Sequence, residues 1–307
     1  MKYNESFIYK YALTVFRGIS MGLADVLPGV SGSTIALITG IYSELINAIK
    51  SIDRQFINFL VGFKFLSAFK HIDGAFLLPL SISVIVGMFI GAKIISLVIS
   101  QYPIHLFSLL SGLIIGASII LLTEIKLFNI VKLLVTICGI TLVVALQLMG
   151  YLNIGSNIVT FYICGFIAGT FMIFPGISGS LALVNINKYE EIVNAISSLQ
   201  FSIIIPVGLG ALTSILLVSR MIHYFFNKIP DYIRSFLVGL MLGSLMQLWP
   251  WKTNVTEHSV NISPSAYYQM YSQSPEVLAA ICLVSIGLAI PLVFKYTTYL
   301  KKQSTIN

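Results

Sequence analysis

Charged residues are scarce in this sequence. Only 9% of its 307 residues are Asp, Glu, Lys or Arg, and 57% are hydrophobic, whereas a soluble globular domain carries about 25% charged residues. Most of such a chain cannot face water, and several of its apolar stretches approach the roughly 20 residues that a helix needs to cross a bilayer. The composition excludes a soluble globular domain and predicts an all-α polytopic membrane protein.

Cysteine and histidine are also rare. Cys138, Cys164 and Cys282 are scattered through apolar segments, which indicates no disulfide framework. The four histidines lie far apart and none has a partner at metal-ligand spacing. We find no paired acid cluster and no Ser/His/Asp set, so we expect no enzyme, no catalytic residue, no metal and no cofactor. We expect no nucleic-acid partner, and the sequence does not reveal an oligomeric state.

One six-residue motif is present twice. Residues 28–33 read Pro-Gly-Val-Ser-Gly-Ser and residues 175–180 read Pro-Gly-Ile-Ser-Gly-Ser, an offset of 175 − 28 = 147. At this offset, 13 of the 34 positions from 18 to 51 are identical. Similar apolar composition alone gives a few matches, not this many with Gly and Pro in register. We therefore predict two repeats, residues 1–150 and 151–307.

The similarity continues farther along the chain at an offset of 127, where Pro79 meets Pro206 and Pro103 meets Pro230. The difference, 147 − 127 = 20 residues, is an insert in the first repeat at about 52–74. Its apolar residues fall at helical spacing with basic residues between and after them. This pattern predicts an amphipathic helix on an anionic membrane surface.

Each repeat is expected to contain one re-entrant helical hairpin and three transmembrane helices. The Gly- and Pro-rich break in the middle of each motif region suits a hairpin better than a span, because irregular backbone at membrane depth must be buried or line a cavity. The hairpins are expected at about 8–50 and 155–198, and the spans at about 76–99, 104–123, 130–150, 202–223, 234–250 and 276–296.

The distribution of basic residues tests this topology. With six spans and both termini cytoplasmic, 15 of the 18 Lys and Arg residues lie inside, and only Lys93, Lys188 and Lys252 fall toward the outside. Three spans per repeat is an odd number, so the second repeat is inverted relative to the first. Inverted repeats are typical of secondary transporters, whose substrate site lies near the midplane. Residues 251–275 are then an external loop.

The motifs have the composition of a phosphate site. A proline stops the first hairpin arm, glycines allow a turn and close approach, and hydroxyls supply donors. The returning helix directs its free N–H groups and positive dipole end at the same point. The candidate residues are Pro28, Gly29, Ser31, Gly32, Ser33, Thr34, Pro175, Gly176, Ser178, Gly179 and Ser180. The alternative, close helix packing by small residues, is favoured for isolated glycines such as Gly112 and Gly116.

Six charged residues complete the set of candidates: Arg17, Asp25, Glu44, Lys93, Glu191 and Arg220. An ionisable residue within the membrane is a functional hypothesis by default. Arg17 is a candidate to attract phosphate and Asp25 to carry a proton or orient the loop, although a structural Arg17–Asp25 pair is an equal alternative. Lys93 and Arg220 are candidates to guide an anionic head group, with snorkelling toward the interface as the alternative.

The run from Arg17 to Thr34, Arg-Gly-Ile-Ser-Met-Gly-Leu-Ala-Asp-Val-Leu-Pro-Gly-Val-Ser-Gly-Ser-Thr, followed by Gly40-Ile41-Tyr42, resembles the signature of the bacterial polyprenyl-phosphate transporter family. The second motif through Tyr189 and the Trp249-Pro250-Trp251 segment resemble it too. Ser33 departs from the family pattern, in which we expect Gly.

The resemblance implies a multi-pass transporter in the bacterial plasma membrane. It would return undecaprenyl phosphate from the outer to the inner leaflet for recycling in cell-wall synthesis. Its partners would be that lipid and the surrounding membrane lipids, and a coupling proton or cation is a further hypothesis. A transporter or channel for a small anion is the alternative, because the motif alone does not distinguish the two.

Overall fold

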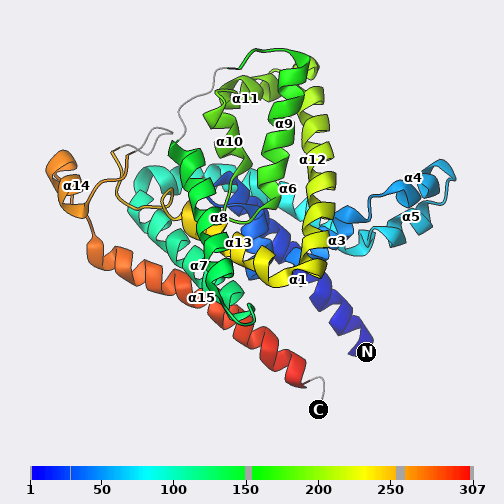
Figure 1. The fold of residues 1–307 in the computed structure, drawn as a ribbon, viewed down its shortest axis with the longest axis horizontal. Helices are drawn as coiled ribbons and strands as arrows, with labels where there is room; N and C mark the ends of the chain where they lie inside the picture. Colours follow the sequence, from blue (N-terminus) through cyan, green and yellow to red (C-terminus); the bar gives the residue numbers. More distant parts are fainter. Residues whose placement is uncertain (1, 28, 149–153, 254–259, 305–307) are drawn as a thin grey trace.

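The chain folds into helices throughout the part that the structure describes. The structure is a computed structural model that describes residues 2–27, 29–148, 154–253 and 260–304 (Figure 1). The first eight helices are α1 (Lys2–Val26), α2 (Gly32–Ile38), α3 (Tyr42–Lys50), α4 (Arg54–Val61), α5 (Phe65–His71), α6 (Gly74–Gln101), α7 (Pro103–Thr123) and α8 (Ile130–Leu148). The others are α9 (Ile158–Ile173), α10 (Gly179–Asn185), α11 (Tyr189–Ser197), α12 (Phe201–Lys228), α13 (Pro230–Ser244), α14 (Pro264–Tyr271) and α15 (Val277–Ser304).

Within the ranges that the structure describes, five helices are long and apolar enough to cross a membrane: α6, α7, α8, α12 and the Val277–Thr297 part of α15. They correspond to five of the six expected spans. Their outward surfaces carry large apolar side chains, such as Phe89 in α6 and Leu278 in α15, each 77% exposed. Extended apolar surface of this kind suits lipid and not water. The chain is therefore a polytopic membrane protein, as its composition predicts.

The sixth segment, 234–250, differs from its expected form. Its helix, α13, ends at Ser244 after 15 residues, and turns follow at 245–248. At about 1.5 Å per residue such a helix reaches roughly 22 Å, short of the roughly 30 Å hydrocarbon core. Pro250 disfavours helical backbone just before it. Leu237 and Met241 are both 0% exposed, so α13 is a short central helix enclosed by its neighbours.

The helix ends recur along the chain at the two sequence offsets. α2 and α3 begin at 32 and 42, and α10 and α11 begin 147 residues later at 179 and 189. α6 covers 74–101, and α12 covers 201–228, 127 residues later at both ends. The repeated sequence thus folds into the same order of helices in both halves.

Four pairs of helices cross in close contact: α1 with α6, α9 with α12, α7 with α15 and α8 with α13. Glycines form the crossing points. In the α7–α15 pair, Gly112 meets the backbone of Val284 and Gly116 meets that of Leu288, so the two helices run in the same direction. Gly112 and Gly116 therefore serve close helix packing, the role expected for them. Two of these pairs join a helix of one half to a helix of the other.

The corresponding helices α7 and α13 run in opposite directions. Glu124, just after the end of α7, lies 3.6 Å from Arg234 near the start of α13. In the middle of α7, Ser111 donates a 3.1 Å hydrogen bond to the carbonyl of Leu248, which follows the end of α13. These two contacts fix the antiparallel direction of the pair.

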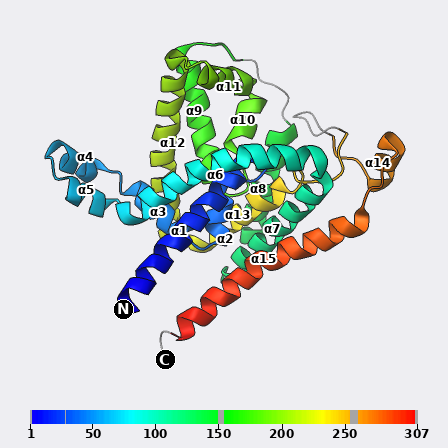
Figure 2. The ribbon, with the colours of Figure 1, turned by 180° about the vertical axis from the view of Figure 1, so that it is seen from behind.

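Residues 52–74 form two short helices and not the single amphipathic helix expected. α4 and α5 are joined by a turn in which Phe63 has a φ of 54°. The ring of His71 lies 3.0 Å from the carboxylate of Asp53 and closes the hairpin. The turn brings the chain back to α6, which a straight helix would not do. This α4–α5 hairpin projects to one side (Figures 1 and 2), with Phe63 80% exposed.

Candidate functional site

The two motifs adopt the same local structure. Gly29 has a φ of 87° and Gly176 a φ of 89°, a region that glycine adopts without strain. Two residues later, Ser31 and Ser33 share a 2.8 Å hydrogen bond between their hydroxyls, and Ser178 and Ser180 share one of 2.6 Å. The repeated sequence therefore encodes a repeated turn with a hydroxyl pair at the start of a short helix.

The two motifs touch each other. The backbone N–H of Gly176 donates to the Thr34 hydroxyl at 2.9 Å, and Thr34 is 0% exposed. The Ser31 hydroxyl donates to the carbonyl of Met172 at 3.2 Å. Tyr42 also reaches across and donates to the carbonyl of Ile173 at 3.2 Å. The motif residues thus lie together where the two halves meet, and their hydroxyls are buried in mutual contacts.

Arg17 and Asp25 do not pair with each other. The Asp25 carboxylate accepts a 2.6 Å hydrogen bond from the Gly32 N–H, at the start of α2. The Arg17 guanidinium donates to the carbonyl of Thr39 at 3.0 Å, at the end of α2. The two side chains of α1 therefore cap the two ends of α2, with charges that match its dipole. This overturns the Arg17–Asp25 pair considered above, because α2 lies antiparallel to α1 and separates the two groups.

The N–H groups at the start of α2 are already engaged, contrary to what we expected. Gly32 N–H is taken by Asp25, and Thr34 N–H donates to the Ser31 carbonyl at 2.8 Å. The Ser33 N–H has a long 3.4 Å contact with the Ser31 hydroxyl. An anionic group thus already occupies this helix start, and it is supplied by the protein itself. At the start of α10, by contrast, Ser178 makes no side-chain cap, and the residue equivalent to Asp25 is Met172.

Arg17 carries one further feature of a binding group. Its Nε atom is buried and has no hydrogen-bond partner in the described part of the chain, and the same is true of the amide nitrogen of Gln147 in α8. A buried donor left unpaired costs about 1–3 kcal/mol. The neighbouring Glu44, in the first turn of α3, lies close enough to interact electrostatically with Arg17. Arg17 therefore lies at the end of α2, beside Thr39 and Glu44, with one donor unused.

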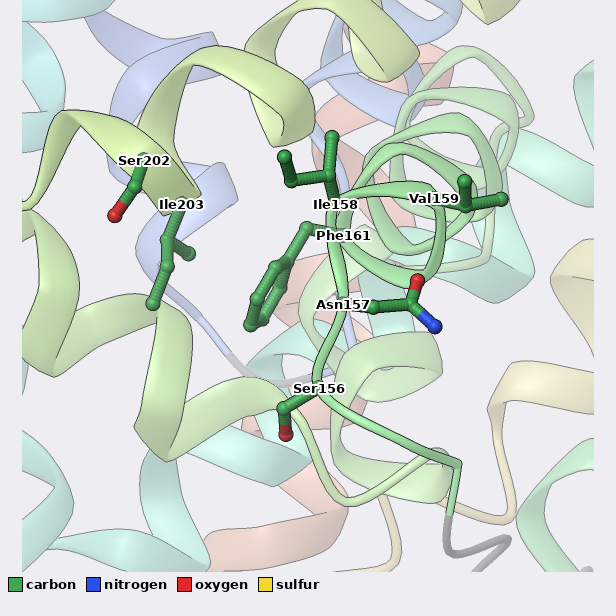
Figure 3. Close-up of a pocket in the computed structure, with 7 residues that line it drawn as sticks. All are labelled: Ser156, Asn157, Ile158, Val159, Phe161, Ser202 and Ile203. Carbon is green, nitrogen blue, oxygen red and sulfur yellow. The ribbon is translucent and has the colours of Figure 1, made fainter.

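Glu191 lies away from the motifs, beyond the far end of α10. A cavity of about 510 Å³ opens there between the starts of α9 and α12, with Phe161 facing it (Figure 3). The Lys188 ammonium donates to Glu191 and to the Ser156 hydroxyl, both at 2.6 Å. Lys188 is 5% exposed. The Glu191 carboxylate therefore balances the charge of the buried Lys188 ammonium beside this cavity.

The other candidates are also spread out. Arg220 donates to the carbonyl of Ile52 at 2.9 Å, beyond the end of α3. Pro175 is buried beside Gly176. Lys93 lies in α6, but its side chain is outside the described part, and Pro28 is outside the described residues altogether. The described residues contain no group of three or more His, Cys, Asp or Glu that could hold a metal ion.

Lys252 is a residue near the first motif that the sequence alone did not single out. Its ammonium lies 4.5 Å from the ring centroid of Phe107 and donates to the carbonyl of Gln247 at 2.5 Å. Burial lowers the pKa of Lys252 to about 8. The Gln247 side chain in turn lies against Gly29. Its position directly after Trp251 was the only available signal, because the contact depends on how the loop folds back onto α7.

Comparisons with known proteins agree with the resemblance found in the sequence. A family model described as VCA0040-like, undecaprenyl phosphate translocase-like, matches residues 21–265, which include both motifs. A polyprenyl-phosphate transporter of Vibrio cholerae serotype O1 is 32% identical over 293 residues, covering 92% of this chain and 95% of that protein. A polyprenyl-phosphate transporter of Staphylococcus aureus is 30% identical over 256 residues, covering 78% and 86%. No solved structure is significantly similar to the chain.

Proposed function

The chain belongs to the undecaprenyl phosphate translocase-like family, and on this premise we propose that it carries a polyprenyl phosphate across the membrane. The proposed substrate is undecaprenyl phosphate, moved from the outer to the inner leaflet of the bacterial plasma membrane. The observation that carries the proposal is the contact between the two motifs, in which Gly176 N–H meets Thr34 at 2.9 Å. Each motif forms a glycine turn with hydroxyl groups at the start of a short helix, and the two motifs meet at the junction of the two halves. We propose that together they bind one phosphate head group, while the isoprenoid tail stays in lipid. No covalent chemistry is required.

The proposed topology is an inverted repeat with re-entrant hairpins. Three observations support it: α7 and α13 are antiparallel, α1 and α2 form a hairpin, and helix ends recur at the same offsets in both halves. The start of α1 and the end of α15 lie at the same end of the molecule (Figures 1 and 2). This agrees with both termini being cytoplasmic. In this topology α13 is a short span buried among its neighbours.

The proposed head-group site consists of the motif residues and Arg17. In the described arrangement the Asp25 carboxylate occupies the start of α2, 2.6 Å from Gly32 N. The substrate phosphate would take this position when Asp25 leaves. The unpaired Arg17 Nε, at the opposite end of α2, would be a donor at another point on the path of the phosphate. The hairpin itself does not need these charges, because the second half has Cys164 and Met172 at the equivalent positions. The proposed site comprises Arg17, Asp25, Pro28, Gly29, Ser31, Gly32, Ser33, Thr34, Pro175, Gly176, Ser178, Gly179 and Ser180.

The four remaining candidates lie outside this cluster or have no described side chain. Glu44 would modulate Arg17 through its charge. Lys93 and Arg220 would guide the head group toward and away from the site at opposite leaflets, and Glu191 would act beside the cavity of Figure 3. The proposed roles of these four residues rest on their positions along the path of the lipid head group and not on contact with the motifs.

The decisive test is the leaflet distribution of undecaprenyl phosphate in cells with and without this protein. Deletion in a strain without another such transporter is expected to increase the lipid exposed on the outer leaflet, measured with an impermeant phosphate-binding probe. Unchanged exposure would contradict the lipid assignment. Efflux or uptake of small anions by proteoliposomes, with no lipid movement, would instead support the small-anion alternative.

Asp25 is the proposed carrier of a coupling proton. Protonation would remove the charge that competes with the phosphate at Gly32 N–H. In proteoliposomes we expect a pH gradient to accelerate lipid transport by the native protein but not by the Asp25→Asn variant. The asparagine amide oxygen still accepts from Gly32, so the hairpin should persist.

The matched control is Asp53→Asn, an acid in the α4–α5 hairpin that also accepts from a helix-start N–H, at 3.0 Å from Phe56 N. It should respond to the gradient as the native protein does. Native transport that ignores the gradient would contradict proton coupling. Acceleration retained in Asp25→Asn would show that another group carries the proton.

A further inference from the structure

A second cavity, which we call the α13 pocket, lies where the start of α8, the end of α12 and the start of α13 meet. Its volume is about 390 Å³. Its polar lining comprises Lys126, Asn129, Lys132, Lys228, Asp231 and Tyr232. Three lysines against one aspartate give 3 − 1 = +2 formal charges. The pocket is therefore electropositive, and it is far along the chain from either motif.

Lys132 and Asp231 form an ion pair in the lining of this pocket. The Lys132 ammonium is 2.8 Å from Asp231, and it also donates to the backbone carbonyls of Lys126 and Leu127. Lys132 is only 7% exposed. Lys132 and Asp231 thus form an ion pair, and this pair cancels its own charge.

Lys126 and Lys228 carry the charge that remains. Both are exposed. The Lys126 ammonium has no partner among the described residues. The Lys228 ammonium donates to the Tyr224 hydroxyl at 2.7 Å and has no acidic partner in the same ranges. Two uncompensated ammonium groups at one pocket match a phosphate in charge and in hydrogen-bond acceptors.

The rim of the pocket is apolar. Leu127 is 90% exposed and is held in a left-handed conformation, with a φ of 49°. The turn that presents it is fixed by the Lys132 hydrogen bonds. Ile229, which also lines the pocket, is 38% exposed. A site for a free ion gains nothing from such a rim, whereas an amphiphile would bury it.

We propose that the α13 pocket binds the phosphate head group of a lipid, with Lys126 and Lys228 as the donors and the Leu127 rim against the chain. The phosphate can belong to a polyprenyl phosphate or to an anionic phospholipid of the bilayer. Its assignment to the transported lipid rests on the proposed function. Binding at the pocket does not, because it is measurable without transport.

The test compares the purified full-length protein with its Lys126→Gln/Lys228→Gln variant in detergent micelles. The probes are undecaprenyl phosphate, phosphatidylglycerol and phosphatidylcholine, each titrated and read by native mass spectrometry. We expect the variant to bind one or both anionic lipids at least tenfold more weakly, as the loss of two charge-assisted hydrogen bonds implies. The matched control, Lys10→Gln/Lys50→Gln, removes two lysines that do not line the pocket and should bind as the native protein does.

The outcomes are distinct. If the variant loses binding of undecaprenyl phosphate alone, the pocket binds the transported lipid. If it loses binding of phosphatidylglycerol alone, the pocket binds a bilayer lipid. If the Lys126→Gln/Lys228→Gln variant binds anionic lipids as tightly as the control variant does, the proposal is wrong. Full competition by millimolar inorganic phosphate would leave a simple anion site and overturn the lipid assignment. Lys126→Arg/Lys228→Arg keeps both charges and should restore binding, which separates charge loss from misfolding. A native protein that binds lipid here but fails the leaflet test would refute the proposed function alone.

Discussion

Replacing Gly210 by alanine is expected to lower the stability of the fold and the yield of folded protein. A Cβ atom at this position would lie well inside contact distance of the Tyr162 carbonyl and 2.8 Å from the backbone nitrogen of Phe166. Both belong to α9, and backbone cannot rotate away as a side chain can. Overpacking of this kind costs about 1–3 kcal/mol or more. We expect a lower yield and a thermal unfolding midpoint several degrees lower in detergent.

The matched control is Gly208→Ala, two residues earlier in the same helix. Gly208 is exposed, and a Cβ atom there would meet nothing within 4 Å. Alanine favours a helix over glycine by up to about 1 kcal/mol, so this variant should be as stable as the native protein or slightly more so. Equal stability of the two variants would mean that α9 and α12 do not cross at Gly210.

The role of these glycines shows what can be read from the sequence and what cannot. The sequence predicts helix packing for Gly112 and Gly116 because they are isolated glycines outside the motifs, and their close contacts with the backbone of α15 agree with this. Their partner was not predictable, because α15 lies about 160 residues farther along the chain and spacing holds no information on it. The pairing of α7 with α15 and of α8 with α13 emerges only when both halves are folded together.

The motif region was predictable in its turns but not in its hydrogen bonds. The repeat gave the order of helices and the equivalence of Gly29 and Gly176. The separation of Arg17 and Asp25 by eight residues equally suited a pair on one face of α1. The direction of α2, which decides that each caps a different end, depends on tertiary packing. Likewise, the short length of α13 reflects burial among neighbours, which hydropathy does not record.

Arg17→Ala is expected to reduce lipid transport by roughly 10- to 100-fold, as loss of a charge-assisted hydrogen bond worth about 1.5–3 kcal/mol implies. The Arg17 Nε is buried without a partner, while another nitrogen of the same guanidinium holds the Thr39 carbonyl at 3.0 Å. A group tethered in this way is oriented before the substrate arrives. The measurement is the rate of undecaprenyl phosphate translocation in proteoliposomes, with folded protein quantified by size-exclusion chromatography.

The second half of the molecule explains why this variant should still fold. Cys164 stands at the position equivalent to Arg17, yet α9 and α10 pack together as α1 and α2 do. The charge is therefore not required to build such a hairpin, and its presence in one half only is better explained by a bound anion. Arg54→Ala, which removes an exposed arginine of α4, is the control and should transport normally. If Arg17→Ala transports as well as Arg54→Ala, then the phosphate does not use Arg17, and the asymmetry between the halves serves the stability of α2 alone.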